Sequence, residues 1–211
     1  MPRLRQVSRD EANDDVRAIY QRLFGDRDPV AQPGTATGTP GDWWTVFALV
    51  PDLLTHAQAG FSFFSSRRRL LPPYFRELAI TRAGFLGGSQ FVFSQHCKAA
   101  RAAGVPEEKL VDVPTWSSSA AFDDADRALL AYTDELVLQD GRVQDATVTR
   151  LKAVLSDEQI LELTYGVCMY RLHATMTRAL RLEYDNVDER IVEIAAPVGE
   201  DAADVMKQIS R

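Results

Sequence analysis

Apolar residues recur every three to four positions along most of this 211-residue chain, as they do on one face of an α-helix. The segments SRDE (8–11) and SDEQ (156–159) are capping boxes, which favour helix starts. No alternation of apolar and polar residues extends beyond four positions, so no strand is expected. The pattern predicts an all-α chain of about eight helices. We expect them over residues 9–23, 43–50, 51–66, 72–86, 89–104, 123–138, 145–155 and 156–182, with short additions after Val105 and over 201–209.

Glycine and proline clusters suggest three parts in the chain. Residues 1–41 combine the first helix with a loop rich in Gly and Pro, which we interpret as an arm or a lid, since a loop of this length in a compact domain is either mobile or part of a site. Residues 42–185 form the expected helical domain, and residues 186–211 form a polar tail with a possible short helix. From 160 to 170 the last long helix is apolar nearly all round, which is typical of a central or interface helix.

The candidate chemistry lies in residues 76–104, which read as a helical hairpin broken at Gly87 and Gly88. Its first helix carries Glu77 on an apolar or small-residue face, and its second carries His96 on a face of small residues. A carboxylate and an imidazole held together can transfer protons near neutral pH. Two simpler hypotheses stay open, in which Glu77 is a structural acid paired with Arg82 or another base, and His96 is a core histidine with its hydrogen bonds satisfied.

The spacing of the cysteines and histidines argues against a dithiol, a disulfide framework and a metal site. Cys97 and Cys168 are 71 positions apart and form no CxxC motif, which fits a reducing cytoplasm better than a disulfide framework. The three histidines, His56, His96 and His173, have no spacing typical of a metal site, so no metal is expected. Ser89 follows two glycines and is the natural N-cap of its helix.

Composition narrows the class of protein further. The chain has 45% hydrophobic and 26% charged residues and a net charge of −6, which argues against nucleic acid as a partner. It has no stretch of about 18 apolar residues that could span a membrane, and no apolar segment behind its charged N-terminus that would make a signal peptide. We therefore expect a cytoplasmic protein whose partner is a small molecule.

Several segments resemble one known family. The segments PDLLTHAQAGFSFF, LPPYFRELAITRAG, SQFVFSQHCKAARAAGVPEEKL, DADRALLAYTDEL and LSDEQILELTYGVCMYRLHATMTRAL are similar, in this order, to members of the carboxymuconolactone decarboxylase and alkylhydroperoxidase D-like superfamily. The resemblance covers roughly residues 45–185. It implies an alkylhydroperoxidase D-like helical fold that assembles into homo-oligomers, trimers or hexamers, with the active site near a subunit interface.

The resemblance also separates the two chemistries of the superfamily. In the peroxidase branch, a CxxC dithiol precedes the histidine that matches His96, and its two cysteines fall on Ser89 and Val92 of this chain. A dithiol peroxidase needs both sulfurs. In the decarboxylase-like branch, a tyrosine-glutamate-tryptophan stretch precedes the same histidine, and here that stretch is Phe91, Val92 and Phe93. The chain thus keeps the shared pair, Glu77 and His96, without the residues specific to either branch.

These resemblances predict a decarboxylase-like enzyme without a cofactor, acting on a small organic acid or lactone. His96 would move the proton, and Glu77 would orient it or balance its charge. Phe91, Val92, Phe93 and Ser89 would line the substrate pocket, while Arg82 or a base from a neighbouring subunit would hold a substrate carboxylate. Two alternatives remain, a peroxidase that uses Cys97 as its lone thiol and a non-catalytic oligomer that binds a ligand or acts as a scaffold.

Overall fold

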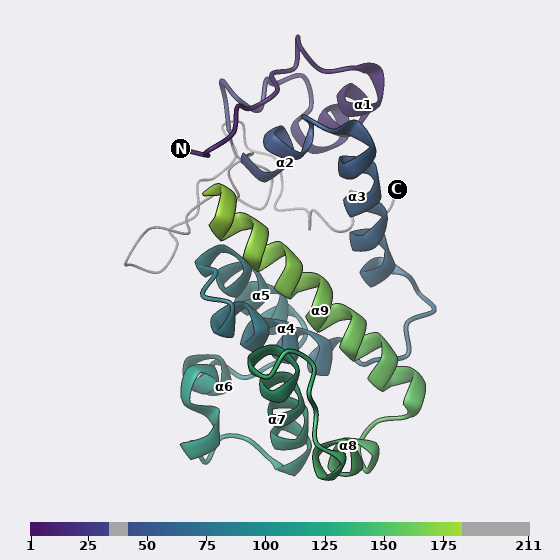
Figure 1. Ribbon diagram of the computed structural model, residues 1–211, viewed down its shortest axis with the longest axis vertical. Coiled ribbons are helices and arrows are strands. Elements are labelled where there is room, and N and C mark those ends of the chain that lie inside the picture. The colour runs from purple at the N-terminus through teal and green to yellow at the C-terminus, as the bar shows by residue number, and fades with distance from the viewer. Residues whose placement is uncertain (34–41, 183–211) are drawn as a thin grey trace. The chain divides into compact units, whose positions relative to one another are not determined.

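The computed structural model describes residues 1–33 and 42–182 (Figure 1). These residues contain nine α-helices, one short 3₁₀ helix and no strand, which confirms the all-α fold. Residues 34–41 of the expected arm or lid, and the C-terminal tail over 186–211 with the helix expected at 201–209, lie outside the described residues. The helices are α1 (Asp14–Phe24), α2 (Asp42–Phe47), α3 (Pro51–Ser65), α4 (Pro73–Leu86), α5 (Gln90–Ala102), α6 (Glu107–Asp112), the 3₁₀ helix Val113–Ser118, α7 (Asp124–Leu138), α8 (Asp145–Lys152) and α9 (Asp157–Leu180).

The described chain forms two compact units. The first comprises the described parts of Met1–Arg69 together with residues 179–182, and the second comprises Leu70–Arg178. The two units therefore divide within the 42–185 range that the sequence treats as one domain. The expected divisions at 41–42 and 185–186 border residues outside the described range, and they stay predictions.

In the first unit, α1 begins later than its capping box suggests. Ser8 and Glu11 do exchange hydrogen bonds, with Ser8 N donating to Glu11 Oε2 at 3.0 Å and Glu11 N donating to Ser8 Oγ at 3.4 Å. Residues 9–11 form only a turn, and Asn13 caps the helix by accepting a hydrogen bond from Val16 N. The expected start at residue 9 is therefore wrong, because two successive caps compete and the second one opens the helix.

In the second unit, α4 and α5 form the hairpin that the sequence predicts (Figure 1). The backbones of these helices come into direct contact at Gly84, where an added Cβ atom would lie 2.8 Å from the backbone nitrogen of Phe93 and 3.0 Å from a methyl carbon of Val92. A side chain at residue 84 would force the helices apart. Glycine at this position therefore sets the distance between the two helices that carry Glu77 and His96.

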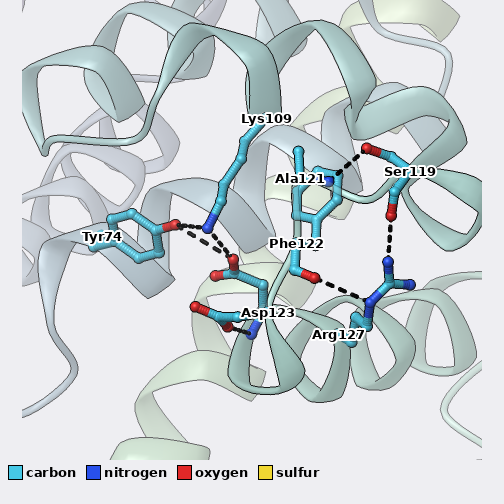
Figure 2. A network of polar contacts seen from close by, with 8 residues as sticks. Tyr74, Lys109, Ser119, Ala121, Phe122, Asp123 and Arg127 are labelled. Atoms are coloured by element: carbon cyan, nitrogen blue, oxygen red, sulfur yellow. Dashed lines mark hydrogen bonds and ion pairs between the residues drawn. The ribbon is translucent and has the colours of Figure 1, made fainter.

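A buried polar network joins α4, α6 and α7 (Figure 2). Lys109 donates to Tyr74 Oη at 2.9 Å and also to Asp126 Oδ2. Asp126 is 1% exposed and Lys109 is 9% exposed. Burial alone would lower the pKa of Lys109, but the hydrogen bonds and charges of Asp126 and Tyr74 outweigh it and raise the pKa, so the ammonium stays charged.

The same network orders the connection into α7. Arg127 donates to the backbone oxygens of Phe122, at 3.1 Å, and of Ser119, as Figure 2 shows. Asp123 accepts from Asp126 N at 2.9 Å and caps α7. The sequence predicts a helix from residue 123, and α7 begins at Asp124 behind this cap. The structure adds the 3₁₀ helix Val113–Ser118, which the serines and the single proline of the segment do not signal.

The second capping box opens α9 as expected. Ser156 N donates to Gln159 Oε1 at 2.9 Å, and Gln159 N donates to Ser156 Oγ at 3.3 Å. Glu162 accepts hydrogen bonds from the backbone nitrogens of Leu70 and Leu71, which ties α9 to the chain entering α4. No helix among the described residues is both long enough and apolar enough to span a membrane.

Candidate functional site

The hairpin brings Glu77 of α4 and His96 of α5 into direct contact. Glu77 Oε2 lies 2.8 Å from His96 Nδ1, although the residues are 19 positions apart. Glu77 is 5% exposed and His96 is 8% exposed, so the hydrogen bond is largely shielded from water. The facing pair of carboxylate and imidazole that the helical spacing predicts is therefore present.

Arg76 lies on the other side of the Glu77 carboxylate. Its Nε donates to Glu77 Oε1 at 2.6 Å. Burial alone would raise the pKa of Glu77, but the hydrogen bond and charge of His96 and the charge of Arg76 together hold it below its ordinary value. Glu77 is therefore a carboxylate at neutral pH, and both of its oxygens accept charge-assisted hydrogen bonds.

This contact selects one tautomer of His96. A carboxylate only accepts hydrogen bonds, so Nδ1 of the imidazole carries the proton, and in the neutral ring Nε2 keeps its lone pair. The ring of Tyr170 in α9 packs edge-on against the imidazole, with ring centroids 4.1 Å apart. Glu77 and Tyr170 together restrain the orientation of the imidazole, as a carboxylate does for catalytic histidines.

The other hairpin candidates lie around this pair. Ser89 is buried, accepts a hydrogen bond from Val92 N and lies 3.2 Å from the Thr177 hydroxyl, so its hydroxyl caps α5 and contacts α9. Val92 is buried one turn before His96. Phe93 is half-buried and packs against Phe85 with ring centroids 6.0 Å apart. The substrate-binding roles of Ser89, Val92, Phe91 and Phe93 stay predictions.

Arg82 takes a different position from the one expected for a substrate-binding base. Its Nε and Nη2 donate to the two carboxylate oxygens of Asp134 at 2.7 and 2.9 Å. Its Nη1 donates to the backbone oxygens of Val113 and Pro114 at 3.0 and 2.9 Å. The guanidinium is thus engaged in four hydrogen bonds within the fold, and the arginine beside Glu77 is Arg76. Neither proposed partner of Arg82, Glu77 or a substrate carboxylate, accounts for these contacts.

The cysteines occupy contrasting environments. Cys97 follows His96 directly, yet its side chain is 0% exposed, whereas Cys168 is exposed on α9. A peroxide could reach the Cys97 sulfur only if the surrounding helices opened. Among the described residues, no three His, Cys, Asp or Glu side chains come close enough together to hold a metal ion.

His173 lies behind Tyr170 on α9, with ring centroids 6.2 Å apart. Burial lowers the pKa of His173 to about 4, because the charged imidazolium would lose its hydration. In the unfolded chain the same group takes up a proton near pH 6.5. Since the folded pKa is the lower one, His173 stabilises the fold above pH 6.5, and this contribution is lost as the pH falls towards 4.

We therefore expect the free energy of unfolding to fall by about 2 kcal/mol between pH 7 and pH 5 through His173 alone. Urea denaturation at both pH values measures the difference, and His173→Leu should remove that part of it. His56→Leu, on the exposed side of α3, is the matched control. Glu77 does not affect this comparison. Because its pKa is lowered, its contribution to the free energy of unfolding is lost only in more acidic solution. An equal pH dependence in the wild type and His173→Leu would contradict the prediction.

Sequence reasoning missed two residues of the site. Arg76 directly precedes Glu77, and neighbours in a helix do not normally face each other, so nothing in the pattern signals their contact. Tyr170 belongs to the nearly all-apolar stretch of α9, where its ring reads as core. Nothing in the residue spacing of α9 signals that Tyr170 faces the hairpin.

Part of the chain matches the model of a known protein family. Residues 53–135 match the model of the carboxymuconolactone decarboxylase family. No curated protein matches the chain. Residues 53–135 include both helices of the hairpin, and so they include Glu77 and His96.

Solved structures share the fold at low sequence identity. A protein of unknown function from Agrobacterium tumefaciens, proposed to be the antioxidant defence protein AhpD, is 19% identical, with a TM-score of 0.56 over 70% of this chain and 96% of that one. The debrominase Bmp8 is 14% identical, with a TM-score of 0.65, both in its apo form (99% of this chain, 96% of that one) and as a C-to-A variant in complex with 2,3,4-tribromopyrrole (84% and 88%). Together, the family match over residues 53–135 and the shared helical fold support the resemblance of this chain to the carboxymuconolactone decarboxylase and alkylhydroperoxidase D-like superfamily.

Proposed function

We propose that the protein is a carboxymuconolactone decarboxylase-like enzyme that carries out acid–base chemistry on a small organic acid or lactone without a cofactor. The observation that carries this proposal is the buried hydrogen bond of 2.8 Å between Glu77 Oε2 and His96 Nδ1. That bond occupies Nδ1, so Nε2 is the imidazole nitrogen that can exchange a proton with a substrate.

The proton transfer follows from the tautomer. In the protonated state of His96, Nδ1–H stays on Glu77 and Nε2–H is the proton to be delivered. When the bond between a substrate carbon and its carboxylate breaks, CO₂ leaves and the electron pair remains on that carbon. Nε2–H then protonates the carbon, and His96 becomes neutral until it takes a new proton from water. Glu77 stabilises the imidazolium and keeps the ring oriented throughout.

Charge supports an anionic substrate. The positive charge of Arg76 and the negative charge of Glu77 cancel, so protonation of His96 leaves the site with one net positive charge. A carboxylate is attracted to such a site, and the attraction is strong where water is largely excluded. Because Arg82 is engaged with Asp134, we assign any additional cation for the substrate carboxylate to a neighbouring subunit.

The two other functions have less support. A peroxidase would need a thiol that peroxide can reach, and Cys97 is fully buried while Ser89 and Val92 carry no sulfur. A non-catalytic scaffold would need no ionised glutamate in the interior. Burying such a group costs free energy that a hydrophobic residue would avoid, so retaining Arg76, Glu77 and His96 together favours a reaction.

Release of CO₂ from carboxymuconolactone, the substrate in the family's name, tests the proposal directly. We expect turnover by the wild type, and a kcat lower by about 100-fold or more in His96→Ala, since general acid–base groups contribute at least that much. Glu77→Gln should also lower kcat, because the amide no longer stabilises the imidazolium. His56→Ala serves as the histidine control and should turn over normally, with circular dichroism showing that each variant is folded.

The same preparations separate the alternatives. Unchanged turnover in His96→Ala would contradict the acid–base assignment. Consumption of peroxide in the presence of a dithiol, abolished by Cys97→Ser and retained in His96→Ala, would support the peroxidase instead. Lack of turnover on carboxymuconolactone and related lactones, together with no peroxidase activity, would leave the non-catalytic function.

A further inference from the structure

Two arginines of α4 bind their carboxylate partners in different ways. Arg82 donates to both oxygens of Asp134 through Nε and Nη2, and its Nη1 donates to two backbone oxygens. Arg76 donates through Nε to Glu77 Oε1, while His96 occupies Oε2 of the same carboxylate. Because Glu77 is shared between two donors, its bond to Arg76 involves a single oxygen. The guanidinium of Arg76 therefore meets its partner without the two parallel bonds that Arg82 forms.

The Arg76 side chain is also the most exposed of the three that make the site. It is 14% exposed, compared with 7% for the side chain of Glu77 and 11% for that of His96. A solute can therefore contact Arg76 more readily than the glutamate that it pairs with. An arginine side chain carries several N–H donors in one plane, so a guanidinium already bound to one carboxylate can bind another.

Glu77 separates Arg76 from the reacting end of His96. The guanidinium lies at Oε1 of the carboxylate, and the imidazole lies at Oε2 through Nδ1. The nitrogen that exchanges protons with a substrate, Nε2, is on the far side of the imidazole from Nδ1. A substrate whose reacting carbon lies at Nε2 would therefore meet Arg76 with a different part of its skeleton.

The chemistry of decarboxylation indicates which group Arg76 suits. The carboxylate that leaves as CO₂ loses its negative charge as the reaction proceeds. A cation that holds this group stabilises the substrate more than the transition state, and so it slows the reaction. A carboxylate that stays on the molecule keeps its charge throughout. Hydrogen bonds to such a group provide binding and orientation without raising the barrier, and a guanidinium forms strong ones.

We propose that Arg76 is a specificity-determining residue, which binds a carboxylate that the substrate keeps, besides any cation that a neighbouring subunit supplies. The preferred ligands of the site then carry a second carboxylate, remote from the one that reacts. This inference rests on the proposed function, since it names how the acid of that reaction is recognised. It concerns binding, however, and binding can be measured without any reaction.

Two unreactive acids test the role of Arg76. Succinate and butyrate have carbon chains of the same length, but only succinate has a carboxylate at both ends. We expect the wild type to bind succinate at least about tenfold more tightly than butyrate in isothermal titration calorimetry, since a charge-assisted hydrogen bond contributes that much. Arg76→Gln should bind the two acids with nearly equal affinity. Arg101→Gln, at an exposed ion pair with Glu107, is the matched control and should keep the preference.

Two further variants keep the test decisive if Arg76→Gln does not fold, since Glu77 loses a partner there. Glu77→Gln leaves the charge of Arg76 uncompensated, so its preference for succinate should exceed that of the wild type. Arg76→Gln combined with Glu77→Gln carries neither charge and should show no preference. Circular dichroism verifies that each variant is folded.

The outcomes separate this inference from the proposed function. A wild type that does not prefer succinate, or a preference that persists in the folded Arg76 variants, would overturn the role of Arg76. Failure of the proposed function has another signature, because lactone turnover would then be absent, or normal in His96→Ala, whichever acid the protein prefers. Loss of the preference in the Arg76 variants would support the role of Arg76 in either case.

Discussion

We expect Lys109→Met to lower the free energy of unfolding by about 3–5 kcal/mol, the usual cost of breaking a buried ion pair from one side. The variant keeps most of the apolar stem of the side chain and removes the ammonium. Asp126 then loses its ammonium partner at 1% exposure, and among the described residues the hydroxyl of Tyr74, 3.5 Å away, is the side-chain donor still beside it. Urea denaturation of the wild type and the variant at neutral pH measures the change.

A double variant identifies the physical origin of this loss. In Lys109→Met combined with Asp126→Leu, no charge remains in the interior, and we expect most of the lost stability to return, because apolar replacements of a buried pair are often neutral. Arg101→Met is the surface control. Its ion pair with Glu107 is solvent-exposed, so the change should cost no more than about 1 kcal/mol. A double variant as unstable as Lys109→Met would mean that lost packing, rather than a stranded charge, explains the effect.

The second large effect is expected at Arg82. Arg82→Met removes both hydrogen bonds to Asp134 and both to the backbone oxygens of Val113 and Pro114. Among the described residues, only Trp116 Nε1, at 3.0 Å, would still donate to the Asp134 carboxylate. We expect a loss of about 3–5 kcal/mol in the free energy of unfolding, since the carboxylate and the backbone oxygens both lose their donors.

A conservative substitution at Arg82 distinguishes a structural role of this side chain from a role in substrate binding. If Arg82 held a substrate, as the sequence predicted, Arg82→Lys would chiefly raise KM. If it stabilises the fold, Arg82→Lys should itself lose stability, because a lysine cannot form the two parallel hydrogen bonds to Asp134. Thermal denaturation and steady-state kinetics on the same preparation distinguish the two outcomes. A stable Arg82→Lys protein with impaired substrate binding would return Arg82 to the site.

The helices were largely predictable because their signals are local. The capping box at 156–159 correctly indicates the start of α9, and the glycines after Leu86 correctly end α4. The identical type of motif at 8–11 led to a wrong start for α1. There the capping hydrogen bonds form without a helix behind them, and Asn13 takes over as the cap. A motif of four residues specifies a local hydrogen-bonding pattern, and whether a helix continues from it depends on the next residues.

The candidate site was predictable only where it lies within the hairpin. Helical spacing brought Glu77 and His96 to facing sides, and a short turn ensured that they meet. Arg82 pairs with Asp134, 52 residues further along the chain, and Tyr170 reaches His96 from α9. Contacts between elements so distant in sequence depend on how the helices pack, for which neither periodicity nor spacing carries a signal.

The backbone contact at Gly84 has a consequence for any reaction at His96. At Gly84 the helices α4 and α5 approach so closely that no side chain fits between them, and this contact fixes the spacing of the two helices that carry Glu77 and His96. The dipoles around the imidazole are therefore already arranged before a proton moves. The imidazole can then gain and lose its charge with little reorganisation energy. In water the surrounding molecules would have to reorient at each proton transfer, and the reorganisation energy would be larger.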